Sequence, residues 1–101
     1  MSNTANDYMK DWVDVLFVTT QDNYDWIDLG VFYSPSARRW FWYEDSGCSC
    51  YCWEAPPTIE EWENGDREAV LRALDNFQGY GDYAASDRLD DKLIVRNFKE
   101  S

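Results

Sequence analysis

The spacing in this chain that most suggests chemistry is that of its three cysteines. They occupy alternate positions in the stretch C-S-C-Y-C over residues 48–52. Alternate side chains of an extended segment point to one side, so the three thiols could meet at a thiophilic metal ion or bond to one another. A structural zinc site, however, usually takes four ligands with at least one wide spacing. A fourth ligand would have to be Asp45, Glu54 or a partner residue, and we expect no metal and no other cofactor.

Redox chemistry is the second possibility for these thiols, because a disulfide between such near neighbours is strained and therefore easily reduced. No Lys, Arg or His lies beside them to lower the thiol pKa, and nearby carboxylates disfavour the thiolate. We therefore interpret the cysteines as small, buryable side chains in a tight structural loop. The residues assigned to this loop are Asp45, Gly47, Cys48, Cys50 and Cys52.

The residue inventory also argues against catalysis elsewhere in the chain. There is no histidine, which excludes Ser/His and Cys/His catalytic pairs and any His-ligated metal site. The sequence has no Gly-rich phosphate loop and no HExxH pattern. Its twenty acidic residues offer too many carboxylate pairs for a hydrolase pair to be singled out. We therefore expect a protein that is not an enzyme.

Acidic side chains form two clusters that could make a binding surface. One repeats every third residue from Asp22 to Asp28, and the other runs from Glu60 to Glu68. Carboxylates on a rigid surface can imitate the phosphates of a duplex or complement a basic cleft. Tryptophan is enriched at interfaces, although the six tryptophans could equally fill the core. The residues predicted to bind a partner are Asp22, Asp25, Asp28, Glu60, Glu61, Glu63, Asp66 and Trp62.

The acidic composition restricts the class of partner. Twenty Asp and Glu against nine Lys and Arg give a net charge of -11 and a pI near 4.1. Nucleic acid is a poor partner for such a chain, because binding it depends on Lys and Arg that neutralise phosphates. No apolar run is long enough to span a membrane, and residues 1–11 lack the apolar stretch of a signal peptide. We expect a basic protein partner, no nucleic acid, no membrane and a cytosolic location.

Three segments have the patterns of β-strands. Residues 13–20 are rich in β-branched side chains, and residues 24–33 alternate apolar and polar positions. A turn containing Pro35 leads to residues 38–45, which carry aromatic side chains on both faces. The third strand should therefore be central or covered on both sides, and an antiparallel meander is the simplest arrangement.

Helices are expected after the two prolines at residues 56–57. A Thr-x-x-Glu capping pattern at Thr58 predicts a short helix that ends at Asn64-Gly65, and Asp66 caps a second with one apolar stripe. Residues 87–99 suit a helix or a strand, and the pattern favours a helix that begins at Ser86 and packs through Leu89, Leu93 and Phe98. The predicted fold is α+β, a three-stranded antiparallel sheet followed by two or three packed helices. Residues 1–12 are expected to be a flexible segment and residues 13–101 a single domain.

The segments D-L-G-V-F-Y and R-R-W-F-W-Y-E-D-S-G-C-S-C, followed by Trp53-Glu54, resemble small proteins of unassigned function encoded by actinobacterial phages. The resemblance covers about residues 13–77, and its specific part is Asp45–Cys50, with Cys52 as an addition. It implies a location in the cytoplasm of the bacterial host and a role in binding and disabling a host component.

Together these features predict a non-enzymatic inhibitor that binds a basic host protein through carboxylates and exposed aromatic side chains, as a nucleic-acid mimic or anti-defence factor. The alternative is a small structural, redox or metal-binding domain that uses Cys48, Cys50 and Cys52. Association through surface charge should weaken steeply with salt, whereas a metal-dependent domain should melt with chelator.

Overall fold

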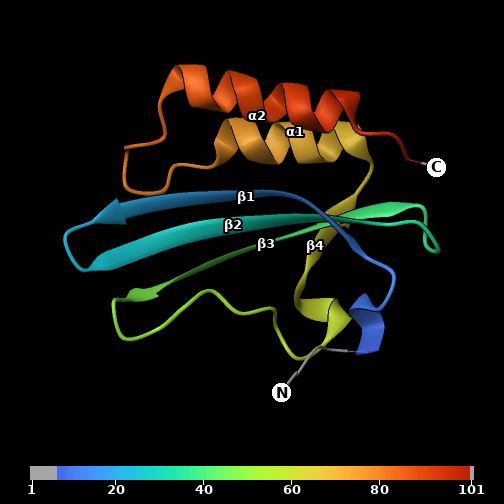
Figure 1. The fold of residues 1–101 in the computed structure, drawn as a ribbon, viewed down its shortest axis with the longest axis horizontal. Helices are drawn as coiled ribbons and strands as arrows, with labels where there is room; N and C mark the ends of the chain where they lie inside the picture. Colours follow the sequence, from blue (N-terminus) through green and yellow to red (C-terminus); the bar gives the residue numbers. More distant parts are fainter. Residues whose placement is uncertain (1–6, 101) are drawn as a thin grey trace.

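An antiparallel sheet with two helices packed on one face is the framework of the protein (Figure 1). The computed structural model describes residues 7–100, and the α+β class predicted from the sequence is confirmed. The strands follow one another in the sheet as β1 (Val13–Asp22), β2 (Asp25–Ser34), β3 (Arg39–Cys48) and β4 (Glu63–Gly65). The helices are α1 (Arg67–Asn76) and α2 (Ala85–Asn97), with 3-10 turns η1 (Asp7–Met9) and η2 (Ile59–Glu61).

The sheet has four strands rather than the predicted three, because the segment before α1 forms a strand and not the expected helix. The Thr58 hydroxyl donates to the Glu61 carboxylate at 2.9 Å and caps no backbone N–H, so only the 3-10 turn η2 forms. The chain then extends as β4 and pairs with the edge of β3, where Trp40 lies opposite Gly65 and Trp42 opposite Glu63. Unpaired backbone groups at a sheet edge favour such pairing over a short isolated helix.

One face of the sheet and the two helices enclose the main core. Side chains from alternate positions of β1, β2 and β3 meet the apolar stripe of α1 and Val95 of α2. Asp66 caps α1 as predicted, since its carboxylate accepts a hydrogen bond from the Ala69 N–H at 2.9 Å. The most deeply buried residues of this core are Val31, Tyr33, Trp40, Val70, Leu74 and Val95.

The final segment is a helix, but its start and its apolar contacts differ from the prediction. Helix α2 begins after Ala84, which makes no side-chain cap, so Ser86 is not the N-cap. Leu89 and Leu93 are exposed, whereas Val95 is buried in the core and the predicted Phe98 packs against it. Two arginines hold α2 against α1: Arg88 donates to backbone carbonyls at the end of α1, and Arg67 donates to those near the end of α2.

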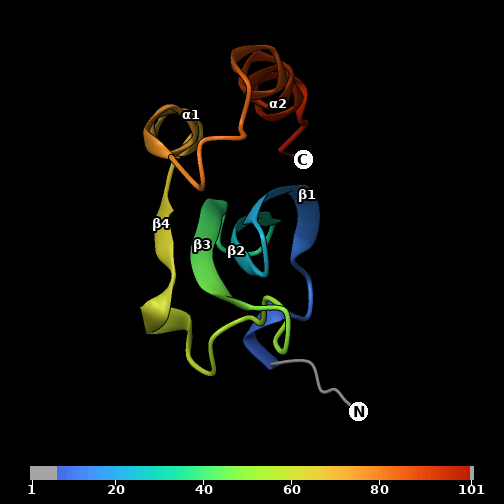
Figure 2. The ribbon, with the colours of Figure 1, turned by 90° about the vertical axis from the view of Figure 1, so that its left-hand side faces the viewer.

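The second face of the sheet is covered by irregular chain, which lies on the side away from the helices (Figure 2). The Trp12 ring stacks on Phe41 with centroids 4.3 Å apart. Trp53 and Trp62 from the segment after β3 complete an aromatic cluster on this face. The prediction that the third strand is covered on both sides is therefore confirmed, with Trp40 on the helix face and Phe41 on the other.

The N-terminal segment takes part in this second layer. Residues 1–6 of the expected flexible segment 1–12 lie outside the described residues, whereas residues 7–12 contain η1 and pack against the sheet. None of the helices within residues 7–100 is long and apolar enough to cross a membrane.

A glycine fixes the connection between the two helices to the end of β1. Gly79 has φ +55, and a Cβ there would lie 2.4 Å from Thr20 Oγ1. That hydroxyl donates to the Ile27 carbonyl at 2.7 Å and accepts from the Tyr80 N–H at 3.2 Å. The connection can approach β1 this closely only because residue 79 has no side chain.

Replacing Gly79 by Ala should therefore lower the free energy of unfolding by roughly 2–4 kcal/mol, from left-handed backbone strain and loss of the Thr20 hydrogen bonds. Equilibrium urea unfolding measures the change. Gly81→Ala is the matched control, because its φ of +86 is also positive but its surroundings are open. The control should lose only about 1–2 kcal/mol, and equal losses for both variants would contradict this account.

Candidate functional site: an acidic groove at the edge of the sheet

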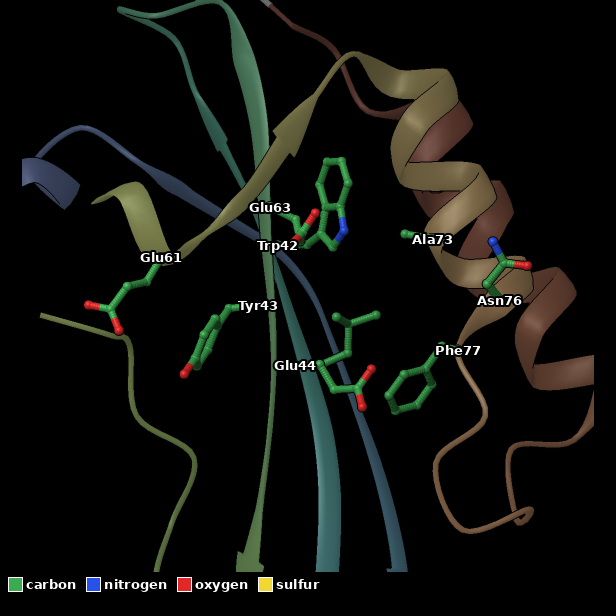
Figure 3. A pocket seen from close by; sticks show the side chains of 9 residues that line it. Trp42, Tyr43, Glu44, Glu61, Glu63, Ala73, Asn76 and Phe77 are labelled. Atoms are coloured by element: carbon green, nitrogen blue, oxygen red, sulfur yellow. The ribbon is translucent and has the colours of Figure 1, made fainter. Parts of the chain in front are cut away.

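The site that best combines carboxylates with aromatic side chains is a groove of about 410 Å³ beside β3, between β4 and α1 (Figure 3). We call it the acidic groove. Its aromatic walls come from Trp42, Tyr43 and Phe77, and its carboxylates from Glu44, Glu61 and Glu63. Leu29, Ala73 and Asn76 complete the lining.

The three carboxylates come from three different elements. Glu44 lies in β3, Glu61 in η2 and Glu63 in β4, and all three are exposed. In Figure 3, Tyr43 and Glu61 lie on one side of the β3 ribbon, while Trp42, Glu44 and Phe77 lie on the helix side. The acidic groove thus passes over the edge of the sheet and presents carboxylates on both of its faces.

The shortness of β4 creates this arrangement. β4 pairs only with Trp40–Trp42, so within the described chain β3 has no strand partner on that side from Tyr43 onward. Such an edge can pair with an extended segment of another chain. The acidic groove can therefore offer backbone hydrogen bonds, aromatic surface and negative charge to the same ligand.

No positive side chain balances the charge of the acidic groove: none of the Lys and Arg residues within residues 7–100 lines it. The pKa of Tyr43 is raised, first by burial and then by the carboxylates of Asp45 and Glu61, because both disfavour the phenolate. The field at the acidic groove is therefore negative, as a cationic partner requires.

The residues predicted to bind a partner fall at two separate places. Glu61 and Glu63 line the acidic groove, whereas Asp22 and Asp25 face each other at the end of the β1–β2 hairpin. Along β3 the two places lie six residues apart, at Trp42 and Cys48, or roughly 20 Å at the rise of an extended strand. Glu60 is exposed in η2 outside the groove lining, and Asp28 lies within β2 opposite Asp45.

Two of the predicted residues have structural roles. Trp62 is only 3% exposed and donates from Nε1 to the Tyr8 hydroxyl at 2.8 Å, so its assignment as a surface anchor is wrong. The Asp66 carboxylate is engaged in capping α1. The sequence reasoning missed Glu44, Trp42 and Phe77, since neither periodicity nor clustering connects residues of β3 with the end of α1.

The cysteine stretch is not the buried loop predicted from the sequence. Cys48 is half-buried at the end of β3, and Cys50 and Cys52 are exposed, all as free thiols. The chain turns after β3, where the Tyr51 N–H donates to the Cys48 carbonyl at 3.0 Å, so the thiols do not share one side of an extended strand. The pKa of Cys50 is raised, first by its hydrogen bond to Cys48.

A tryptophan holds this turn in place. The Trp26 Nε1 donates to the carbonyls of Cys48 and Tyr51 at 2.8 and 3.0 Å. Gly47 permits the contact, because a Cβ there would lie 2.8 Å from the Trp26 ring. The structural assignment of Gly47 thus has a physical basis, and within residues 7–100 no three Cys, His, Asp or Glu side chains are grouped as a metal site requires.

Asp28 is the one predicted acidic residue with an unfavourable environment. Its Oδ1 is buried and has no hydrogen-bond partner within the described residues. Burial raises its pKa from the ordinary value of 3.8, and the facing Asp45 adds to the rise, while a backbone hydrogen bond from Thr20 opposes it. The ionised carboxylate therefore weakens the fold locally.

Replacing Asp28 by Asn should raise the free energy of unfolding at neutral pH, by about 0.2–1 kcal/mol from relief of the like-charge pair. Because the folded-state pKa of Asp28 is raised, protonation stabilises the native protein, so the advantage of the variant should shrink as pH falls through that pKa. Thermal melts at neutral and acidic pH measure this change in stability, with Glu54→Gln as a control at an exposed site. An advantage that is independent of pH, or a loss of stability at neutral pH, would contradict this interpretation.

Comparisons with known proteins identify the family of this chain. Neither the curated proteins nor the solved structures gave a match. A family model described as Domain of unknown function (DUF7574) matches residues 2–93, which is most of the sequence. The chain therefore belongs to the DUF7574 family.

Proposed function

We propose that this protein is a non-enzymatic binding protein that engages and inhibits a basic host protein through the acidic groove. The observation that carries the proposal is the meeting of Glu44, Glu61 and Glu63 with half-buried aromatic side chains along a strand edge that has no strand partner in the described chain. A Lys- or Arg-bearing segment in extended conformation complements all three features at once.

The distribution of charge supports a basic partner over a neutral one. The chain has a net charge of -11, and no Lys or Arg from the described residues intrudes into the acidic groove. An approaching basic surface would be attracted over long range and meet no like charge at the docking point. The proposal includes nucleic-acid mimicry, in which carboxylates of this protein take the place of phosphates on a basic partner surface.

The biological setting that we propose rests on the loop over residues 45–50. From its resemblance to small actinobacterial phage proteins, we expect the partner in the cytoplasm of an infected bacterium. The inhibited component would then be a host protein with a basic binding cleft, such as one that handles nucleic acid in defence against the phage.

The test compares two triple variants with identical changes in net charge. The groove variant carries Glu44→Gln, Glu61→Gln and Glu63→Gln, and the control variant carries Glu54→Gln, Glu68→Gln and Asp90→Asn at exposed sites outside the groove. Basic proteins captured from host lysate by the unaltered protein are identified, and their affinities for each variant are measured at low and high salt.

The groove variant should bind its partner about threefold to 150-fold more weakly, since three charge contacts at roughly 0.2–1 kcal/mol each sum to about 0.6–3 kcal/mol. The control variant should retain most of the affinity, and salt should weaken binding steeply in every case. Equal losses of affinity in both variants would show that only the net charge of the protein matters and not the groove. Capture of no basic protein would overturn the proposal. Melting by chelator would instead favour the alternative use of Cys48, Cys50 and Cys52.

A further inference from the structure

A second hollow, of about 430 Å³, lies between the hairpin half of the sheet and the turn after β3. Five of its eleven lining residues are aromatic, and we call it the aromatic cup. The rings come from Phe17, Tyr24, Trp26, Tyr51 and Trp53, and the polar lining includes Thr19, Asp28 and Ser49. None of the residues that line the acidic groove takes part in it.

Close contacts with the sheet fix the two indoles of the aromatic cup. Trp53 lies over Gly30, where an added Cβ would approach its ring to 2.7 Å, and its Nε1 donates to the Tyr43 carbonyl at 3.1 Å. Trp26 lies over Gly47 in the same way, with its Nε1 held by the Cys48 carbonyl. Both N–H groups are thus occupied by the backbone, and both rings are held in place before any ligand arrives.

The charge of the aromatic cup is negative and unbalanced. Asp28 belongs to its lining, and Oδ1 of this residue is buried with no hydrogen-bond donor in the described part of the protein. Asp45 lies directly opposite Asp28 in the strand register, which adds a second negative charge beside it. No Lys or Arg from residues 7–100 lines the cup to compensate.

The aromatic cup, with a carboxylate in its wall, is suited to one class of ligand. The faces of Trp rings attract cations through their quadrupole, and a desolvated carboxylate adds direct charge pairing and accepts N–H bonds. An anion is repelled, and a neutral apolar group gains no charge pairing with the Asp28 carboxylate that lines the cup. We propose that the aromatic cup binds an alkylammonium group between Trp26, Trp53 and Asp28.

The proposal is independent of the acidic groove and of any partner bound there. The ammonium could belong to a free amine or to the side chain of a lysine in a peptide, since both present the same head on an alkyl stem. The aromatic cup is open enough for either, with Tyr24 and Tyr51 exposed at 78% and 68%.

Calorimetric titration of the full chain with n-butylammonium tests the site, with 1-butanol as the uncharged probe of similar shape. A Gly-Lys-Gly peptide with both ends blocked distinguishes a lysine side chain from a free amine. The variants are Asp28→Asn in the cup and Asp90→Asn, an exposed acid of α2 outside its lining. In parallel, the Asp28 carboxyl is titrated by NMR with and without the amine.

The ammonium should bind at least about tenfold more tightly than butanol, and Asp28→Asn should remove most of that difference while Asp90→Asn leaves most of it. Binding should also lower the Asp28 pKa, because the cation favours the carboxylate. Comparable affinity for butanol, an unaltered Asp28 titration, or undiminished binding by Asp28→Asn would each overturn the proposal. Binding of butylammonium without the peptide would restrict the ligand to free amines.

Discussion

The sheet is apolar on both of its faces, and the rest of the structure follows from the need to cover both. On one side Val31, Tyr33 and Trp40 require the helices, and on the other Phe32 and Phe41 require a second layer, which within residues 7–100 contains only single turns of helix. Tryptophan rings supply that layer, because each covers a large area of strand with few backbone residues. Gly30 and Gly47 allow the rings to lie directly on the backbone of the sheet.

Covering both faces with apolar residues leaves the many carboxylates at the margins of the layers. The acidic groove forms where β4 stops short and the helix-side core ends at Phe77, and the aromatic cup forms where the second layer ends at Trp26 and Trp53. In both places aromatic surface meets uncompensated negative charge. Two sites with the same chemistry thus arise from one structural cause, the limited extent of the layers that cover the sheet.

Local patterns in the sequence predicted the elements better than the sites. The three long strands, the Asp66 cap and the covered third strand each depend on side-chain alternation or capping chemistry within a few residues. The strand β4 was missed because its pairing depends on a distant edge of β3, and Trp62 was misplaced because its burial depends on contacts with Tyr8 and Trp12. The acidic groove combines residues of β3, η2, β4 and α1, so only tertiary structure brings Glu44 together with Phe77.

The central claim is that basic groups bind where aromatic rings and free carboxylates meet, and the six tryptophans provide a direct measurement. Their indole N–H signals can be followed by two-dimensional NMR during titration with a short peptide of Lys and Arg. The account predicts that the signals of Trp42, Trp26 and Trp53 shift with saturation, while the buried Trp40 and Trp62 stay nearly fixed. Small, unsaturable shifts of all six signals would contradict it, because they would indicate only a diffuse attraction to the net charge.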